Sequence, residues 1–417
     1  MTSEKSSNLR KYKSKFIIRR EIWLVIIPVI VYILVLIFHF VYTHYINLEY
    51  RVIIADQLVF YNRGIGVLQG KLPYKDFYTN AAPLSSYLWG PIVFISMVGS
   101  GDFNLDFLGN DNFIESNSMM LSSYIFRIFF VITIILSAIL LFRLEERRKN
   151  KHAFPIALIY SLNPFFIFLV SFWGSDECIV PLLILLPVYL YERGNKTLAT
   201  LSIVLGVGLK YFPVFMAPII WVYSENWKQR IIQTLIFIIG LVAMIIPFYL
   251  LDPEKFISLL EDPIQEQGNQ GILTIIQSFF NVEINQYSYV FQIFTIIMVC
   301  LSGLILYLKR NDWNYRQTAA LLLVFLIFYQ KMQISYIVMI FPFLFVSFFE
   351  KGLIRWMSIL LFLTTVFYSE IANYLIGTSQ IPLLNQILAW IFIIMFYILL
   401  VINTILHILK SKTRMPI

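Results

Sequence analysis

The sequence is poor in charge, in cysteine and in histidine. Only 13% of its 417 residues are charged, whereas 59% are hydrophobic, and the mean hydropathy is +0.76. Soluble domains have about a quarter of their residues charged, so this composition excludes an ordinary soluble protein. Two cysteines, Cys178 and Cys300, exclude a disulfide framework, and four scattered histidines give no metal-binding spacing. We therefore predict an all-α polytopic membrane protein without a histidine-ligated metal centre, and we expect no cofactor.

Long apolar runs are abundant. The first extends from residue 22 to about 46, which is long enough to cross a bilayer. We predict about 12 transmembrane helices within residues 22–409, preceded by a basic segment (1–21) and followed by a short tail (410–417). The further apolar runs lie at 121–143, 153–171, 177–191, 197–210, 211–224, 229–251, 287–308, 316–331, 333–349, 354–372 and 383–409. The two short runs around Lys210 suggest a shallow helical hairpin.

Basic residues are unevenly placed along this pattern. If the N-terminus is cytosolic and the runs alternate, the inner segments hold 24 of the 32 Lys and Arg residues. This is the positive-inside bias, so we predict that both termini are cytosolic. The net charge of +8 then indicates orientation and attraction to anionic lipid rather than a nucleic-acid partner. The membrane would be the plasma membrane of a prokaryote or the endoplasmic reticulum of a eukaryote.

Two sizeable outer loops follow from this topology, at residues 47–118 and 252–286. The first contains an apolar stretch, 83–98, that does not fit the alternation of sides. We interpret the stretch as an interfacial or re-entrant helix within a structured loop.

Ionisable residues gather at one predicted level, the outer helix ends. Such residues are costly at membrane depth and are therefore functional candidates. Each also has a plainer interpretation: Asp56 and Asp76 in a polar loop, Asp176 as the cap of the following helix, and the lysines reaching to the interface. Their shared level nevertheless favours an outward polar site for a phosphate-bearing lipid. The set comprises Asp56, Asp76, Arg127, Asp176, Glu177, Lys210 and Lys331.

Short motifs occur in an order that resembles a known superfold. The order is Asp56 with Val59-Phe60, Gly70-x-x-Pro73-Tyr74, Pro83-Leu84, Leu162-Asn-Pro164, Gly174-x-Asp176, Gly206 through Lys210-x-x-Pro213, Lys331 through Tyr336, and Pro342. From about residue 51 to 349 the chain resembles the GT-C glycosyltransferases that use polyprenyl-phosphate sugars. Its motifs are similar to those of the catalytic subunits of GPI mannosyltransferase I and related prokaryotic membrane mannosyltransferases. The first loop departs from that family, because Ile54 stands where an acidic residue is usual.

The resemblance implies a function. The chain would transfer a hexose, such as mannose, from a polyprenyl- or dolichyl-phosphate donor to a glycan or lipid-linked acceptor on the outer or lumenal face, with inversion and without a metal. Asp56 would be the catalytic base. Lys210, Lys331 and Arg127 would bind the donor phosphate. The side chains of Asp76, Tyr74, Asp176 and Tyr336 would bind the sugar or acceptor, and the two aspartates could instead orient the lysines.

Two other classes stay open at this point. A transporter or flippase of a lipid-linked anion would place paired ionisable residues near the bilayer midplane. A non-catalytic assembly subunit would leave Asp56 away from any shared site. A partner subunit is compatible with all three interpretations.

Overall fold

The structure, a computed structural model, consists of helices. Within the described residues every regular element is helical, apart from one isolated bridge between Pro73 and Phe77. This confirms the predicted all-α class. Lys331 and most of the second predicted outer loop lie outside the described residues. Those described are 2–42, 55–77, 79, 82–103, 116–256, 288–308, 315–329, 334–376 and 383–410.

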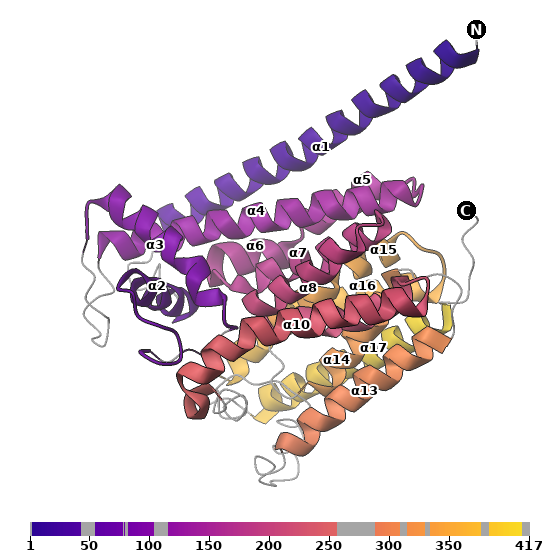
Figure 1. Cartoon of the computed structure of the whole chain (residues 1–417). Coiled ribbons are helices and arrows are strands. Elements are labelled where there is room, and N and C mark those ends of the chain that lie inside the picture. Colours follow the sequence, from indigo (N-terminus) through magenta and orange to yellow (C-terminus); the bar gives the residue numbers. More distant parts are fainter. Residues whose placement is uncertain are drawn as a thin grey trace.

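Long helices run alongside one another and form the body of the molecule (Figure 1). One, two or three consecutive helices occupy the described part of each apolar run that the sequence predicts. The elements of this body are α1 (Thr2–Val41), α4 (Asn117–Arg147), α5 (Ala153–Ser161), α6 (Pro164–Phe168), the π-helix η3 (Leu169–Trp173), the 3₁₀-helix η4 (Asp176–Ile179), α7 (Val180–Glu192), α8 (Lys196–Leu209), the 3₁₀-helix η5 (Phe212–Met216), α9 (Ala217–Tyr223), α10 (Trp227–Leu251), α13 (Ser288–Leu308), α14 (Tyr315–Phe328), the 3₁₀-helix η8 (Ile334–Ile340), α15 (Phe341–Phe348), α16 (Leu353–Ile376) and α17 (Leu383–Lys410).

Two further helices, α2 (Ala55–Leu68) and α3 (Ser85–Ser100), lie in the first predicted outer loop. They pack on each other, and α3 also packs on α4. The Phe60 ring stacks on Trp89 with ring centroids 4.7 Å apart, and Phe126 of α4 meets Trp89 edge-on at 5.3 Å. A Cβ atom at Gly64 would lie only 2.5 Å from Val93, so α2 and α3 approach closely because this position is glycine. The described part of the loop is therefore well packed.

Four described helices are long and apolar enough to cross a membrane. The described shorter apolar helices, such as Lys196–Leu209 and Phe212–Trp221, fall below that length. A membrane protein is thus supported, and the count of about 12 spans stays a prediction. The four long candidates are Arg19–Val41, Asn117–Arg147, Ala153–Trp173 and Trp227–Leu251.

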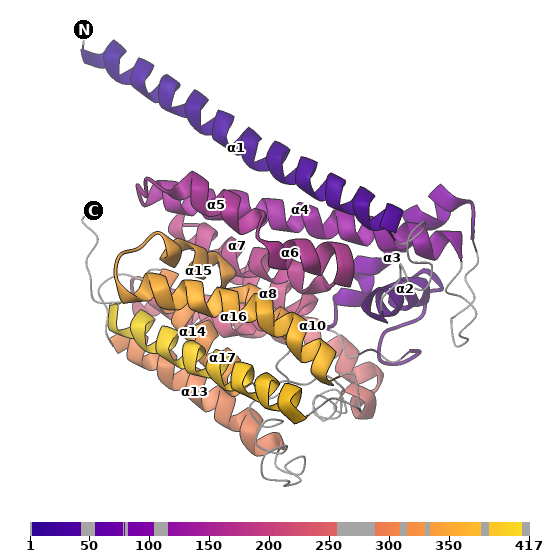
Figure 2. The same cartoon turned by 180° about the vertical axis from the view of Figure 1, so that it is seen from behind.

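The two ends of the bundle differ in character (Figures 1 and 2). At the end that holds the turn between α4 and α5, ion pairs join separate helices: Arg143 contacts Glu21 of α1 at 2.6 Å, and Arg148 contacts Glu192 of α7. Both views place α2 and α3 at the opposite end. This arrangement is the one that the charge-based topology predicts, although the side of the membrane on which each end lies stays a prediction.

Candidate active site

Asp56 lies in the first turn of α2, half-buried, with Trp173 of η3 donating a hydrogen bond to its carboxylate. Burial raises the pKa of Asp56 above its ordinary value, and the negative charge of Asp176 adds to the rise. Lys210 and Arg63 oppose that rise by favouring the charged form. A carboxyl with a raised pKa is a stronger base than an ordinary one, which suits a group that must accept a proton.

Lys210 separates α8 from η5 and connects two acidic residues. Its Nζ donates to Oδ1 of Asp176 at 2.5 Å and to Oε1 of Glu177 at 3.0 Å. The Lys210 side chain is only 22% exposed, so solvent screens these contacts less than surface pairs. Asp176 is therefore engaged with Lys210 and makes no side-chain cap for the helix that follows. The alternative that this aspartate orients a lysine agrees with the geometry.

The acidic pair is presented by an unusual backbone. The π-helix η3 ends at Trp173, Gly174 adopts a left-handed conformation with φ of 60°, and the 3₁₀-helix η4 begins at Asp176. Departures of this kind from α-helical geometry are frequent at functional sites. The hydroxyl of Ser175 is hydrogen-bonded to the Glu177 carboxylate. A local hydrogen bond thus helps to fix the segment from Gly174 to Glu177, in addition to the contacts that its acidic side chains make with Lys210.

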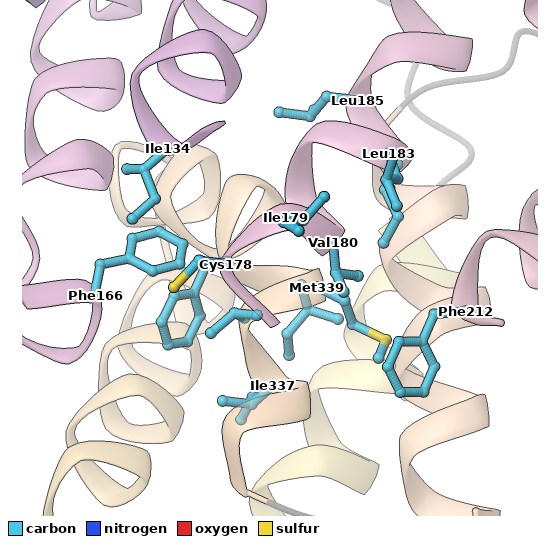
Figure 3. Packing of buried hydrophobic residues seen from close by; sticks show 14 of the residues in the cluster. Ile134, Phe166, Cys178, Ile179, Val180, Leu183, Leu185, Phe212, Ile337 and Met339 are labelled. Carbon is cyan, nitrogen blue, oxygen red and sulfur yellow. The ribbon is translucent and has the colours of Figure 1, made fainter. Parts of the chain in front are cut away.

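The residues that follow the acidic pair are anchored in the hydrophobic core (Figure 3). Cys178 is fully buried, and Phe166 lies beside it in Figure 3. Ile337 of η8 approaches from below, where η8 packs against η4 and α7. Close packing of this kind resists displacement, so the backbone that carries Asp176 and Glu177 has a rigid foundation.

Gln57, next to Asp56, attaches α2 to the bundle. Its side chain is 1% exposed, and its Oε1 accepts a hydrogen bond from the Ser123 hydroxyl of α4 at 2.7 Å. A Cβ atom at Gly174 would lie 2.0 Å from Gln57 Nε2, so only glycine leaves room for this amide. Asp56 consequently keeps its place relative to Trp173 and the acidic pair.

Arg127 of α4 stabilises the same contact between α2 and α4, because it binds Ser123, the partner of Gln57. Its Nη1 is hydrogen-bonded to the hydroxyl and the carbonyl of Ser123, and its Nε donates to the Ser171 carbonyl at 3.2 Å. The guanidinium carbon lies 5.7 Å from the centre of the Tyr124 ring. The structure therefore places Arg127, predicted as a phosphate ligand, in a buried network that joins α4, η3 and Gln57. A role in phosphate binding stays a prediction.

Arg63 belongs to the site although sequence reasoning passed over it. It lies on α2 seven residues after Asp56, which is two helical turns, so both side chains project from the same face. Arg63 is 7% exposed, and it interacts electrostatically with Asp176, Tyr74, Asp56 and Tyr211. The seven-residue spacing from Asp56 is the signal that could have identified it.

Tyr74 is held in a strained backbone conformation. Its φ of 69° is rare for a residue other than glycine, and the side chain is 1% exposed. The Tyr74 hydroxyl is hydrogen-bonded to that of Tyr211, which follows Lys210 directly. Its ring meets Phe248 at 5.7 Å and Phe256 at 5.3 Å. Tyr74 thus joins the first loop to the Lys210 segment.

Asp76, by contrast, is an exposed turn residue. Its Oδ2 accepts a hydrogen bond from the backbone N–H of Leu72 at 2.8 Å, and its own N–H donates to the Leu72 carbonyl at 2.9 Å. This contact closes the turn that presents Tyr74. The polar-loop interpretation of Asp76 agrees with this placement, and a role in sugar binding stays a prediction.

Tyr336 lies in η8 and is 8% exposed. Its ring meets that of Phe212, two residues beyond Lys210, with centroids 4.7 Å apart. The late segment of the sequence therefore reaches the neighbourhood of Lys210, as the shared-site hypothesis expects. In the part of the chain that the structure describes, no group of three or more His, Cys, Asp or Glu residues is arranged to hold a metal ion.

Comparison with known protein families gives one match. A model of glycosyltransferase family 87 matches residues 117–342, a segment that includes Arg127, Asp176, Lys210 and Tyr336 and begins after Asp56 and Tyr74. No curated protein matches the chain. The matched segment covers more than half of the sequence and carries the acidic pair together with its lysine. The chain therefore belongs to glycosyltransferase family 87.

Proposed function

We propose that this membrane glycosyltransferase transfers a hexose, with mannose as the first candidate, from a polyprenyl- or dolichyl-phosphate donor. The acceptor would be a glycan or a lipid-linked sugar on the non-cytosolic face. Family membership supports the transfer of a sugar. The location of α2, which carries Asp56, at the end opposite the turn between α4 and α5 supports the non-cytosolic face.

The observation that carries the proposal is the half-buried Asp56, held by Trp173 beside the Lys210–Asp176 pair. In the proposed reaction the acceptor hydroxyl oxygen forms a bond to the anomeric carbon of the donor. The bond from that carbon to the phosphate oxygen breaks, and its electron pair leaves with the phosphate. The hydroxyl proton passes to Asp56, which becomes neutral. A one-step displacement of this kind inverts the anomeric configuration and needs only one base.

Lys210 has a different role in this proposal from the one that the sequence suggested. Its two carboxylate contacts, at 2.5 and 3.0 Å, make it a positioning residue for Asp176 and Glu177 and a source of positive charge beside Asp56. Asp176, fixed in this way, is the candidate to bind hydroxyl groups of the sugar or acceptor. Tyr336 would line the same region from η8, and Tyr74 would contribute by holding the first loop in place.

A transporter or flippase is the less favoured function. A transporter of this kind would carry paired ionisable residues near the bilayer midplane. In the described site, Lys210 follows the end of α8 and Asp176 precedes the start of α7, so the pair lies at helix ends. Membership of a glycosyltransferase family also favours chemistry over transport.

The test is a transfer assay with purified full-length protein in lipid nanodiscs. Polyprenyl-phosphate mannose, glucose and galactose would each be supplied with a panel of glycan and glycolipid acceptors, and released polyprenyl phosphate would be measured by mass spectrometry. We expect one donor to be consumed in an acceptor-dependent way, with a product of inverted anomeric configuration by NMR. Consumption of a nucleotide sugar instead, or retention of configuration, would overturn the proposal. A Glu225→Gln variant, altered at an exposed carboxylate paired with Lys196, is the matched control.

A further inference from the structure

We propose that Arg63 binds the phosphate of the lipid donor, while Lys210 holds Asp176 and Glu177 in place. This inference rests on the proposed function and assigns its donor-binding cation. It moves phosphate binding, which the sequence analysis assigned first to Lys210, to a residue of α2.

Lys210 is committed to carboxylates. Its single positive charge lies within 3.0 Å of two acidic groups, Asp176 and Glu177, so the three side chains together carry a net negative charge when both acids are ionised. A phosphate placed there would be repelled by the same carboxylates that hold the ammonium group. Binding a donor through Lys210 would require breaking at least one of these contacts, which makes Lys210 a poor phosphate ligand.

The guanidinium group of Arg63 differs from the ammonium group of Lys210 in the number and arrangement of its hydrogen-bond donors. A guanidinium offers five N–H donors in a planar fork, so it can bind two phosphate oxygens and still keep contacts with neighbouring groups. It is also less strongly hydrated than an ammonium group, which lowers the cost of its burial. Arg63 is 7% exposed, and the charges of Asp176 and Asp56 act on it as well, so its guanidinium would serve acidic neighbours and a phosphate together, which the single ammonium group of Lys210 cannot do.

The position of Arg63 fits the geometry of an inverting transfer. The base and the leaving phosphate must lie on opposite sides of the anomeric carbon. Inverting glycosidases accordingly hold their two acting groups about 6.5–9.5 Å apart. Asp56 and Arg63 are separated by two turns of α2, so their backbones lie roughly 10 Å apart along one face.

The helix that carries both groups is rigidly placed. The close approach of Gly64 to Val93 of α3 fixes the turn next to Arg63, and the Gln57–Ser123 hydrogen bond fixes the turn next to Asp56. A rigid element holds reacting groups at a constant separation, which is what an in-line displacement needs.

The experiment measures binding of farnesyl phosphate, a short soluble analogue of the leaving group, to detergent-purified full-length protein by isothermal titration calorimetry. Farnesol, which lacks the phosphate, is the reference ligand. The variants are Arg63→Met, Arg63→Lys and Lys210→Met. Arg230→Met is the matched control, because Arg230 is also a buried arginine, but it contacts the Ser224 carbonyl near the start of α10.

We expect Arg63→Met to weaken farnesyl phosphate binding by about tenfold to a hundredfold, the cost of one lost charge-assisted contact, and to leave farnesol binding unchanged. Arg63→Lys should recover only part of the loss, because lysine keeps the charge without the fork. Arg230→Met should retain nearly the affinity of the unaltered protein, and Lys210→Met, which removes a nearby positive charge without removing the proposed ligand, should lose less affinity than Arg63→Met. If Arg63→Met fails to fold, as judged by its melting temperature, the Arg63→Lys variant decides the question.

Equal farnesyl phosphate affinity in the Arg63 variants and the unaltered protein would overturn the inference, as would a larger loss in Lys210→Met. These outcomes differ from failure of the proposed function. In that case the unaltered protein would bind farnesyl phosphate and farnesol alike and would consume no polyprenyl-phosphate sugar.

Discussion

The Nζ atom of Lys210 lies 2.5 Å from Oδ1 of Asp176, which joins two residues that are 34 positions apart in the sequence. The same ammonium group reaches Glu177 at 3.0 Å. This arrangement connects the turn before α7 with the turn after α8 and places a positive charge next to Asp56. The chemistry that we propose depends on this connection, because it sets the charge environment of the base.

The pH dependence of transfer should report that environment. The rate should fall as Asp56 is protonated, and because the pKa of Asp56 is raised, this acidic limb should lie at higher pH than for an ordinary aspartate. Among the groups around Asp56, Lys210 and Arg63 lower the pKa of Asp56, whereas Asp176 raises it. Lys210→Met should therefore move the limb to higher pH and Asp176→Asn to lower pH. Profiles of kcat between pH 4 and 9 test this, and shifts in the same direction for both variants would contradict it.

Gly174 should be intolerant of any side chain. Gly174→Ala combines a left-handed backbone with a Cβ atom 2.0 Å from Gln57 Nε2, so the Gln57 side chain would have to move and its hydrogen bond with Ser123 would be disturbed. We expect a loss of kcat of at least about tenfold, together with about 1–3 kcal/mol of lost stability. Gly194→Ala is the matched control, since Gly194 has a φ of 82° and nothing within 4 Å of its Cβ position. Equal effects of the two substitutions on kcat would show that the Gln57 contact is unimportant.

Tyr74 offers a test of the first loop. Tyr74→Phe removes only the hydroxyl that meets Tyr211 and should cost about 1 kcal/mol of stability. Tyr74→Ala also removes the ring packed against Phe248 and Phe256, and should cost about 3–5 kcal/mol. Thermal unfolding in detergent, with donor KM measured alongside, checks both. A Tyr74→Phe variant of full stability but much higher donor KM would favour direct sugar binding over loop positioning.

Much of the fold follows from the sequence because apolar runs are a direct consequence of the bilayer. Helices occupy every predicted run, and α3 occupies the stretch at 83–98 that the charge rule excluded as a crossing. The sequence could not show that α1 begins at Thr2, within the polar basic segment, because hydropathy marks the apolar part of a helix and not its end. Nor could it distinguish the π-helix at Leu169–Trp173 from an α-helix, because the apolar run is the same in either conformation.

The site was predicted in part, through ionisable residues at one level. That reasoning selected Asp56, Asp176 and Lys210, which the structure brings together. The sequence could not show what each charged side chain contacts. A charged residue near a helix end gives the same sequence pattern whether its side chain contacts an acid, a phosphate or water. Arg127 illustrates this, since its acceptors are two backbone carbonyls and a serine hydroxyl. Arg63 was missed because it lies in a predicted loop, where charge is ordinary, and in none of the short motifs that carry the family resemblance, whereas Asp56 and Tyr74 belong to such motifs.

The most direct test of the account is the transfer rate of Asp56→Asn, measured beside its ability to bind farnesyl phosphate. Asparagine keeps the shape of the side chain and removes its capacity to accept the proton. We predict that transfer falls by about a hundredfold to ten-thousandfold, the usual contribution of a general base, while farnesyl phosphate affinity and the melting temperature stay close to those of the unaltered protein. An Asp56→Asn variant that transfers sugar at the rate of the Glu225→Gln control would contradict the central claim.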